Sequence, residues 1–227
     1  MATEGFDSVY EEGYGYYGME GFANVFHILD PWAQELSGGR ALDIGCGDGR
    51  VSIGLAGRGF DVEAVDDSPV AIEKLRTTAS ENELSIHARV GDVTGITIEQ
   101  QSYDLIVAVT ILDHIRQKEA ATLARKIEQG VRAGGFIFVQ VFLDDDPGLL
   151  PEQPGLVPSP TADYVHNYYP KEPHGGSLLD VFAGSGEVVS YSEAQWHDTS
   201  HGEPHHHSTA TLVMQKGPSR GWQERLF

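Results

Sequence analysis

The class of fold of this 227-residue chain can be inferred first from the stretch Ala41-Leu42-Asp43-Ile44-Gly45-Cys46-Gly47-Asp48-Gly49-Arg50. It predicts a short apolar strand that ends in a glycine turn and opens a helix. A second strand pattern, Val62-Glu63-Ala64-Val65-Asp66, follows it and ends on a carboxylate. This order is typical of a nucleotide-type pocket at the carboxyl edge of a parallel sheet. For the glycines alone, a tight strand–helix turn without a ligand is the alternative.

Strand and helix patterns continue to alternate along the chain, with short turns between them. Helices are predicted over residues 51–58, 68–82 and 117–129, the second with Ser68 as its N-cap and Pro69 in its first turn. Strands are predicted over residues 86–90, 104–112, 136–142, 187–196 and 208–216. The alternation predicts a single α/β domain with a doubly wound, mostly parallel sheet and helices on both faces.

The glycine spacing and an acid inside the first strand favour S-adenosylmethionine (SAM) over a dinucleotide. Dinucleotide sites space their glycines as G-x-G-x-x-G under a pyrophosphate, whereas this chain has Gly45-x-Gly47-x-Gly49. SAM has no pyrophosphate. The glycines would let backbone amides approach the carboxylate of SAM, and the Asp43 carboxylate would bind its ammonium group. Asp66, 21 residues after Gly45, would accept both ribose hydroxyls.

Residues 38 to about 143 resemble the class I SAM-dependent methyltransferases. The matching pieces, in order, are residues 42–49, 65–69, 91–93, 103–106 and 133–135. The resemblance implies a Rossmann-like sheet of seven strands, the last antiparallel, and an adenine amino group that donates to Asp92. Asp67 stands where the family often has an apolar residue against adenine. The implied cofactor-binding residues are Asp43, Gly45, Cys46, Gly47, Asp66, Asp67, Ser68, Asp92, Val93 and Thr110. The stretch 201–216 is similar to the tail of the tellurite-resistance type methyltransferases.

The residues that follow the fourth core strand are the predicted catalytic residues, Asp113 and His114. In the family this place lines the reacting centre. Methyl transfer from a sulfonium is an in-line displacement, so alignment matters most, and a base is needed only if the acceptor arrives protonated. The alternatives are that Asp113 caps the next helix and that His114 is a packed core histidine.

Two segments outside the common core are predicted to shape the acceptor site. Residues 10–26 interleave aromatics with glycine and acids, which predicts a lid over the cofactor with Tyr14 and Tyr17 as substrate contacts. Simple packing of a helix on the sheet is the alternative. Residues 144–176 are rich in proline, acids and aromatics and predict a substrate cover, against the alternative of a flexible insertion. The expected division is 1–37 lid, 38–143 cofactor core, 144–186 substrate cover, 187–216 hairpin and 217–227 tail.

A histidine cluster, His197, His201 and His205 to His207, lies between the last two predicted strands. Strand alternation puts His205 and His207 on one side and His206 opposite. The pair could serve as a base, contact an oxyanion or bind a metal. Two histidines at positions i and i+2, without a third ligand, are weak evidence for a zinc site. Substrate contact by this pair is therefore favoured, and no metal site is predicted.

Charge and cysteine content limit the partners. The net charge is −19, with 15 basic against 34 acidic residues, and no basic stripe could neutralise nucleic-acid phosphates. A small-molecule acceptor is therefore predicted, with O, N, S or chalcogen as the acceptor atom. The single Cys46, the lack of a signal-peptide pattern and the lack of a long apolar stretch predict a cytoplasmic protein without a membrane partner. A non-catalytic SAM-binding domain and a dinucleotide-dependent oxidoreductase are the alternative functions.

Overall fold

The computed structural model describes residue 10 and residues 18–147, 167–198 and 205–217. Tyr14, Tyr17, His201 and residues 148–166 of the predicted substrate cover lie outside these ranges. Side chains of residues 18–24, 198 and 205 also lie outside the description, so the predicted contact by His205 stays a prediction.

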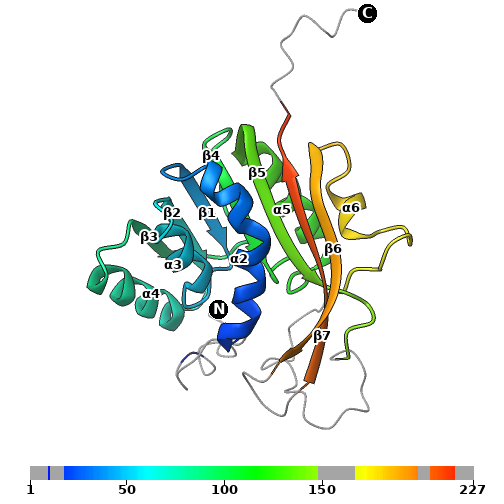
Figure 1. The fold of residues 1–227 in the computed structure, drawn as a ribbon, viewed down its shortest axis with the longest axis horizontal. Coiled ribbons are helices and arrows are strands. Elements are labelled where there is room, and N and C mark those ends of the chain that lie inside the picture. The colour runs from blue at the N-terminus through cyan, green and yellow to red at the C-terminus, as the bar shows by residue number, and fades with distance from the viewer. Residues whose placement is uncertain (1–9, 11–17, 148–166, 199–204, 218–227) are drawn as a thin grey trace, which may run out of the picture.

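Seven strands form one sheet in the order β3-β2-β1-β4-β5-β7-β6 (Figure 1). Their bounds are β1 Arg40–Ile44, β2 Asp61–Asp66, β3 Ile86–Val90, β4 Tyr103–Val109, β5 Val131–Phe142, β6 Glu187–Asp198 and β7 His205–Gln215. Strands β1 to β5 pair in parallel, whereas β7 is antiparallel to both β5 and β6. The predicted seven-stranded, mostly parallel sheet with an antiparallel last strand is confirmed.

Helices cover both faces of the sheet. They are α2 Gly18–Glu35, α3 Arg50–Ala56, α4 Pro69–Glu81, α5 Gln117–Gly130 and α6 Leu178–Val181. Ala41 of β1 packs in a cluster with residues of α2 and α3, while its neighbour Leu42 packs in a cluster with residues of α5 and α6. Because both faces are covered, the central strands are apolar without interruption. Figure 1 shows α2 crossing one face, with α5 and α6 on the other.

The structure corrects some predicted boundaries. Strand β4 ends at Val109 rather than Leu112, because Thr110 adopts a φ of 49° and leaves the strand conformation. Strand β5 begins at Val131, five residues before its predicted start. The N-cap of α5 is Arg116, so the alternative in which Asp113 caps this helix is wrong.

Other local predictions are confirmed. The Ser68 hydroxyl accepts a hydrogen bond from the backbone N–H of Ala71 at 3.1 Å and caps α4. The predicted C-terminal hairpin is present as β6 and β7. Within the described ranges, no helix combines the length and the apolar character needed to cross a membrane.

Candidate active site

The glycine turn after β1 has a backbone that only glycine adopts without strain. Gly45, Gly47 and Gly49 have φ values of 72°, 51° and 90°. A Cβ atom at Gly45 would lie 2.8 Å from the Cδ1 atom of Ile111, and one at Gly47 would clash with the hydroxyl oxygen of Tyr10. The turn therefore runs directly against the segment after β4 on one side and against Tyr10 on the other.

Backbone amides of this turn are engaged within the protein. The N–H groups of Gly45 and Cys46 donate to the carbonyl oxygen of Val65 at 2.8 and 3.1 Å. The N–H of Gly47 donates to the Asp66 carboxylate at 2.8 Å. We expected these glycines to let backbone amides approach the carboxylate of SAM, and this stays a prediction. The glycines contribute the shape of the turn and the room beside it.

Asp66 joins three pieces of the predicted site. One carboxylate oxygen accepts from the N–H of Gly47, and the other accepts from the N–H of Ser68 at 3.0 Å. Its backbone oxygen accepts from the N–H of Gly91 at 2.8 Å. Burial raises the pKa of Asp66 to about 6, although these backbone hydrogen bonds oppose the rise. The ends of β1, β2 and β3 thus meet at one carboxylate.

Asp43 is a buried acid with a single side-chain donor. Its carboxylate accepts a hydrogen bond of 2.6 Å from the hydroxyl of Ser52. Burial raises the pKa of Asp43 to about 7, while the Ser52 bond lowers it and the charge of Asp66 adds to the rise. A cation beside Asp43 would favour its ionised form, so the site fits the ammonium group of SAM. Sequence reasoning missed Ser52, whose signal is its place in the first turn after the glycines.

Three of the predicted cofactor residues have packed side chains. Cys46 and Val93 are buried in the core, and burial raises the pKa of the Cys46 thiol. Ser68 is buried and occupied as the cap of α4. The side chains of Cys46 and Val93 therefore present little surface to a ligand.

The other two acids predicted to face the nucleoside differ in environment. Asp67 is half-buried directly after Asp66. Asp92 is exposed, and its carboxylate accepts from the backbone N–H and the hydroxyl of Thr94, each at 2.8 Å. The bond from Gly91 to Asp66 brings Asp92 to the same edge of the sheet as Asp66.

The end of β4 holds a strained backbone. Thr110 is buried, has a φ of 49° and donates its N–H to the carbonyl of Gln140 at 2.8 Å. A β-branched residue in this region costs about 1–3 kcal/mol. The strain turns the chain so that the next residue, Ile111, packs against Gly45.

Asp113 and His114 follow this bend. Asp113 is 1% exposed, and its carboxylate accepts from the N–H of Phe142 at 3.3 Å. Its backbone oxygen accepts from the N–H of Asn167 at 2.7 Å, so Asp113 ties three segments together. The His114 ring is half-buried and meets the Phe142 ring edge-on at a centroid distance of 6.3 Å. His114 is therefore the more accessible of the two predicted catalytic residues.

The histidine cluster divides as strand alternation predicts. His206 is exposed and its ring lies 4.9 Å from that of His197, whereas His207 is 5% exposed. His207 Nδ1 lies 3.2 Å from the carboxylate of Asp146, a residue that sequence reasoning missed within the acidic run 144–146. Among the described residues, no group of three His, Cys, Asp or Glu side chains could hold a metal ion.

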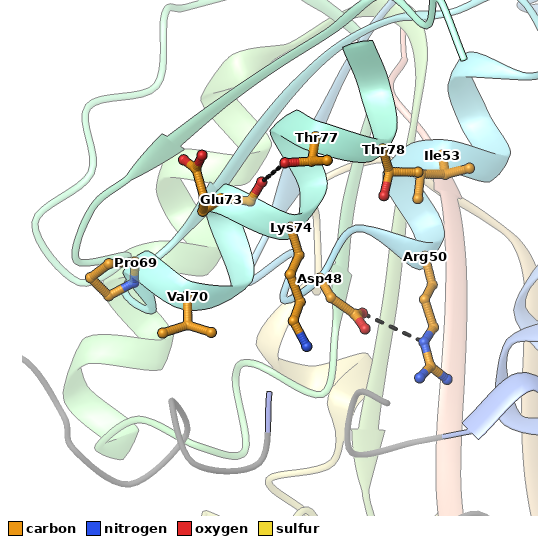
Figure 2. Close-up of a pocket in the computed structure, with 9 residues that line it drawn as sticks. All are labelled: Asp48, Arg50, Ile53, Pro69, Val70, Glu73, Lys74, Thr77 and Thr78. Atoms are coloured by element: carbon orange, nitrogen blue, oxygen red, sulfur yellow. Dashed lines mark hydrogen bonds and ion pairs between the residues drawn. The ribbon is translucent and has the colours of Figure 1, made fainter. Parts of the chain in front are cut away.

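A cavity of about 710 Å³ opens between the start of α3 and one side of α4, from Pro69 to Thr78. Figure 2 shows Asp48 and Arg50, an ion pair of 3.5 Å, beside the Lys74 side chain. Asp48 directly follows Gly47, so the cavity adjoins the glycine turn. The Lys74 amine donates to the backbone oxygen of Tyr10, which holds this residue across the turn.

Residues 41–135, from β1 into β5, match the family model described as a methyltransferase domain. This is the part of the sheet that carries the glycine turn and the acids around it. The architecture of the chain is therefore that of the class I SAM-dependent methyltransferases, as the resemblance predicted, and SAM is the cofactor of that class.

The chain is similar to TehB of Haemophilus influenzae, a probable SAM-dependent methyltransferase. The two sequences are 29% identical over 121 residues, or 52% of this chain and 42% of the relative. The TehB crystal structure superimposes with a TM-score of 0.68 at 21% identity, over 84% of this chain and 62% of TehB.

Two further similarities cover more of the chain. A ubiquinone biosynthesis O-methyltransferase of Coxiella burnetii is 28% identical over 139 residues, or 61% of this chain and 56% of the relative. A solved structure that concerns the conversion of a disulfide bond into a thioacetal group during echinomycin biosynthesis superimposes with a TM-score of 0.68 at 22% identity. It covers 100% of this chain and 96% of that one, and it shows the shared fold.

Proposed function

We propose that this chain transfers the methyl group of SAM to a small-molecule acceptor by in-line displacement, with O, N, S or a chalcogen as the acceptor atom. The proposal rests on one observation: the glycine turn and the ends of β2 and β3 all contact Asp66. The residues predicted to contact the methionine, ribose and adenine parts of SAM come together there at one edge of the sheet, which supports the proposal.

The acids at this edge suit the parts of SAM in turn. Each oxygen of Asp66 receives one backbone N–H, and a carboxylate offers about four lone-pair positions, so it retains capacity for two ribose hydroxyls. Asp43 with Ser52 offers a buried negative charge to the ammonium group. When bound, SAM supplies an electrophilic methyl group on a good leaving group, so the protein's task is alignment and exclusion of water.

Two segments support the predicted lid and cover. Tyr10 lies against Gly47 and is held there by Lys74. Beyond β5, the N–H of Tyr169 donates to the carbonyl of Phe142 at 3.0 Å, and the N–H of Asp144 donates to the carbonyl of Tyr169 at 2.9 Å. The second half of the cover thereby lies along the carboxyl end of β5, where an acceptor would approach.

The named relatives determine how specific the proposed acceptor can be. TehB and the ubiquinone biosynthesis enzyme are both methyltransferases by name, and the second acts on oxygen. The chain spans 42% and 56% of their lengths, so their particular acceptors are not carried over. The charge of −19 supports an acceptor other than nucleic acid. A cytoplasmic location stays a prediction.

The test is calorimetric titration with SAM, S-adenosylhomocysteine (SAH) and NAD, using the wild type, Asp66→Ala and Asp61→Ala. Asp61 begins the same strand at the opposite edge of the sheet and is exposed, which makes it a matched control. We expect SAM and SAH to bind, and binding to weaken at least tenfold in the Asp66 variant only. NAD binding alone would favour the oxidoreductase alternative. SAM binding without methyl transfer to any acceptor in a labelled-methyl screen would favour the non-catalytic domain.

A further inference from the structure

A buried histidine–carboxylate pair lies where the carboxyl end of β5 meets the start of β7. His207 is 5% exposed and Asp146 is 1% exposed. One oxygen of Asp146 lies 3.2 Å from Nδ1 of His207 and also accepts from the backbone N–H of Ser208 at 2.7 Å. The backbone bond fixes the carboxylate, and the carboxylate in turn fixes the plane of the imidazole.

The pair stands on the cofactor side of the sheet. Alternate residues of a strand share a face, so His207 shares one with Val213, which packs in the cluster that includes residues of α2. Asp43 shares that face through Ala41, which packs in the same cluster. Two strands lie between β1 and β7 in the sheet order, so the three spacings across the sheet amount to about 14 Å. Along the strands, Asp43 lies level with Val213, and His207 therefore lies about 20 Å further towards the carboxyl ends of the parallel strands. The glycine turn follows β1 in the same direction, so the turn and the pair both lie beyond the carboxyl ends of the parallel strands.

The carboxylate decides which ring nitrogen carries the proton. An ionised carboxylate only accepts hydrogen bonds, so the neutral imidazole donates from Nδ1 and has its lone pair on Nε2. The nearby charge of Asp146 contributes to raising the pKa of Asp113 to about 7, after the larger effect of burial.

We propose that His207 is the general base for an acceptor that arrives protonated, with Asp146 as its positioning residue, and that the acceptor is a small planar hydroxyl compound of the phenol class. The proposal rests on the methyltransferase function proposed above. The oxygen–hydrogen bond of the acceptor breaks and its proton moves to Nε2 of His207. The oxygen forms a bond to the methyl carbon, and the carbon–sulfur bond breaks with its electron pair on sulfur, which gives SAH. The Asp146 carboxylate stabilises the imidazolium ion that results.

Aromatic rings around His207 favour a flat acceptor. The Phe142 and Trp196 rings each lie 4.9 Å from the His207 ring, measured between centroids. The Tyr168 ring packs on Phe142 at 6.2 Å. Such surroundings offer a planar molecule apolar contact and ring stacking, whereas a small hydrated oxyanion would lose its water there without a cationic partner in return.

Other titratable groups around the pair must be considered in a pH profile. Those that face His207 or its partners from the described elements are Asp113, His114, Asp145, Asp146 and Tyr168. His206 faces the other side of β7, against His197. His206→Gln is therefore a control that removes a neighbouring imidazole without touching the pair.

The test compares two acceptors of the same shape, catechol and thiophenol, the second being largely ionised near neutral pH. SAH binding is measured first in every variant, which separates a failure of folding or of the cofactor site from a failure of the base. In His207→Gln we expect kcat/KM for catechol to fall about 100-fold or more, as for loss of a general base, and the loss for thiophenol to be at least tenfold smaller. His206→Gln should match the wild type on both.

Asp146 is tested by its effect on the pH profile. In Asp146→Asn the imidazolium ion loses its stabilising charge, so the rising limb of kcat/KM for catechol should shift to lower pH and the plateau should fall. Asp146→Glu should restore the wild-type limb. Equal losses on the two acceptors in His207→Gln, an unshifted limb in Asp146→Asn, or failure of a SAM-binding wild type to methylate catechol would each overturn the proposal. Absence of SAM binding in the wild type would instead refute the proposed function.

Discussion

At the scale of single residues, the acids at the carboxyl edge of the sheet link the site to stability. Asp43 and Asp113 are buried, and burial raises the pKa of each to about 7. Such a group is protonated more readily in the folded than in the unfolded chain. Its contribution to stability is therefore complete below its unfolded pKa and is lost as the pH rises through the folded value.

Asp113→Asn isolates this effect. The variant keeps an oxygen that can accept from the N–H of Phe142, and it removes the buried charge. We expect its free energy of unfolding to exceed that of the wild type at about pH 8 and the difference to shrink as the pH falls towards about 4, since the folded wild-type carboxyl is then protonated and no longer carries a buried charge.

Urea denaturation across this pH range measures the difference. Glu81→Gln, at an exposed position of α4, is the control and should show no such pH dependence. A constant difference between Asp113→Asn and wild type at all pH values would show that Asp113 carries no raised pKa.

At the scale of elements, a glycine inside α3 sets how closely α2 approaches. A Cβ atom at Gly54 would clash with the Phe26 ring on α2. The Arg58 guanidinium lies over the same ring, 4.2 Å from its centroid, and Arg58 Nε donates to Asp30 at 2.5 Å. The Phe26 ring of α2 thus packs between Gly54 and the Arg58 guanidinium, and these contacts hold α2 against α3.

Gly54→Ala should destabilise the protein although alanine is the better helix former. The gain in helix propensity is about 0.5–1 kcal/mol, whereas overpacking costs about 1–3 kcal/mol. In a Phe26→Ala background the same change should become stabilising, because the clash is gone. Thermal or urea unfolding of the double-mutant cycle measures this coupling.

Gly57 of the same region supplies the control. A Cβ atom at this position would meet nothing closer than 3.4 Å, and the φ of Gly57 is −62°. Gly57→Ala should therefore be neutral or slightly stabilising. If Gly54→Ala behaves like Gly57→Ala, the close approach of α2 is not limited by this glycine.

At the scale of the whole molecule, the charge of −19 opposes compaction through self-repulsion. Raising NaCl from about 0.01 M to about 1 M shortens the screening length from about 30 Å to about 3 Å. We expect the melting temperature at pH 8 to rise with salt by several degrees.

The sequence pI of about 4.7 provides the comparison within the same protein. Near pH 5 the net charge is small, so the salt effect should nearly vanish. Calorimetric melts at the two pH values check this, and an equal rise at both would assign the effect to salting-out rather than to charge screening.

The order of elements and the cofactor half of the site followed from local pattern. Alternation of apolar runs, the helix cap at Ser68 and the glycines of the turn act over a few residues, so they can be recognised without knowing the fold. The acids Asp43 and Asp66 stand at the ends of two strands that parallel pairing must bring to the same edge. For this reason the class of fold follows from the sequence, which also predicts the edge of the sheet at which the cofactor would bind.

Only the tertiary structure decided the partners of these residues. Ser52 reaches Asp43, Tyr10 covers Gly47, and Asp146 lies against His207 across 61 positions of the chain. Such pairs depend on the packing of loops and on the register between β5 and β7, and no spacing in the sequence encodes them. The end of β4 is similar, since the bend at Thr110 interrupts an apolar run that continues to Leu112. Long-range packing, rather than local preference, sets these positions because it supplies most of the free energy that overrides propensity.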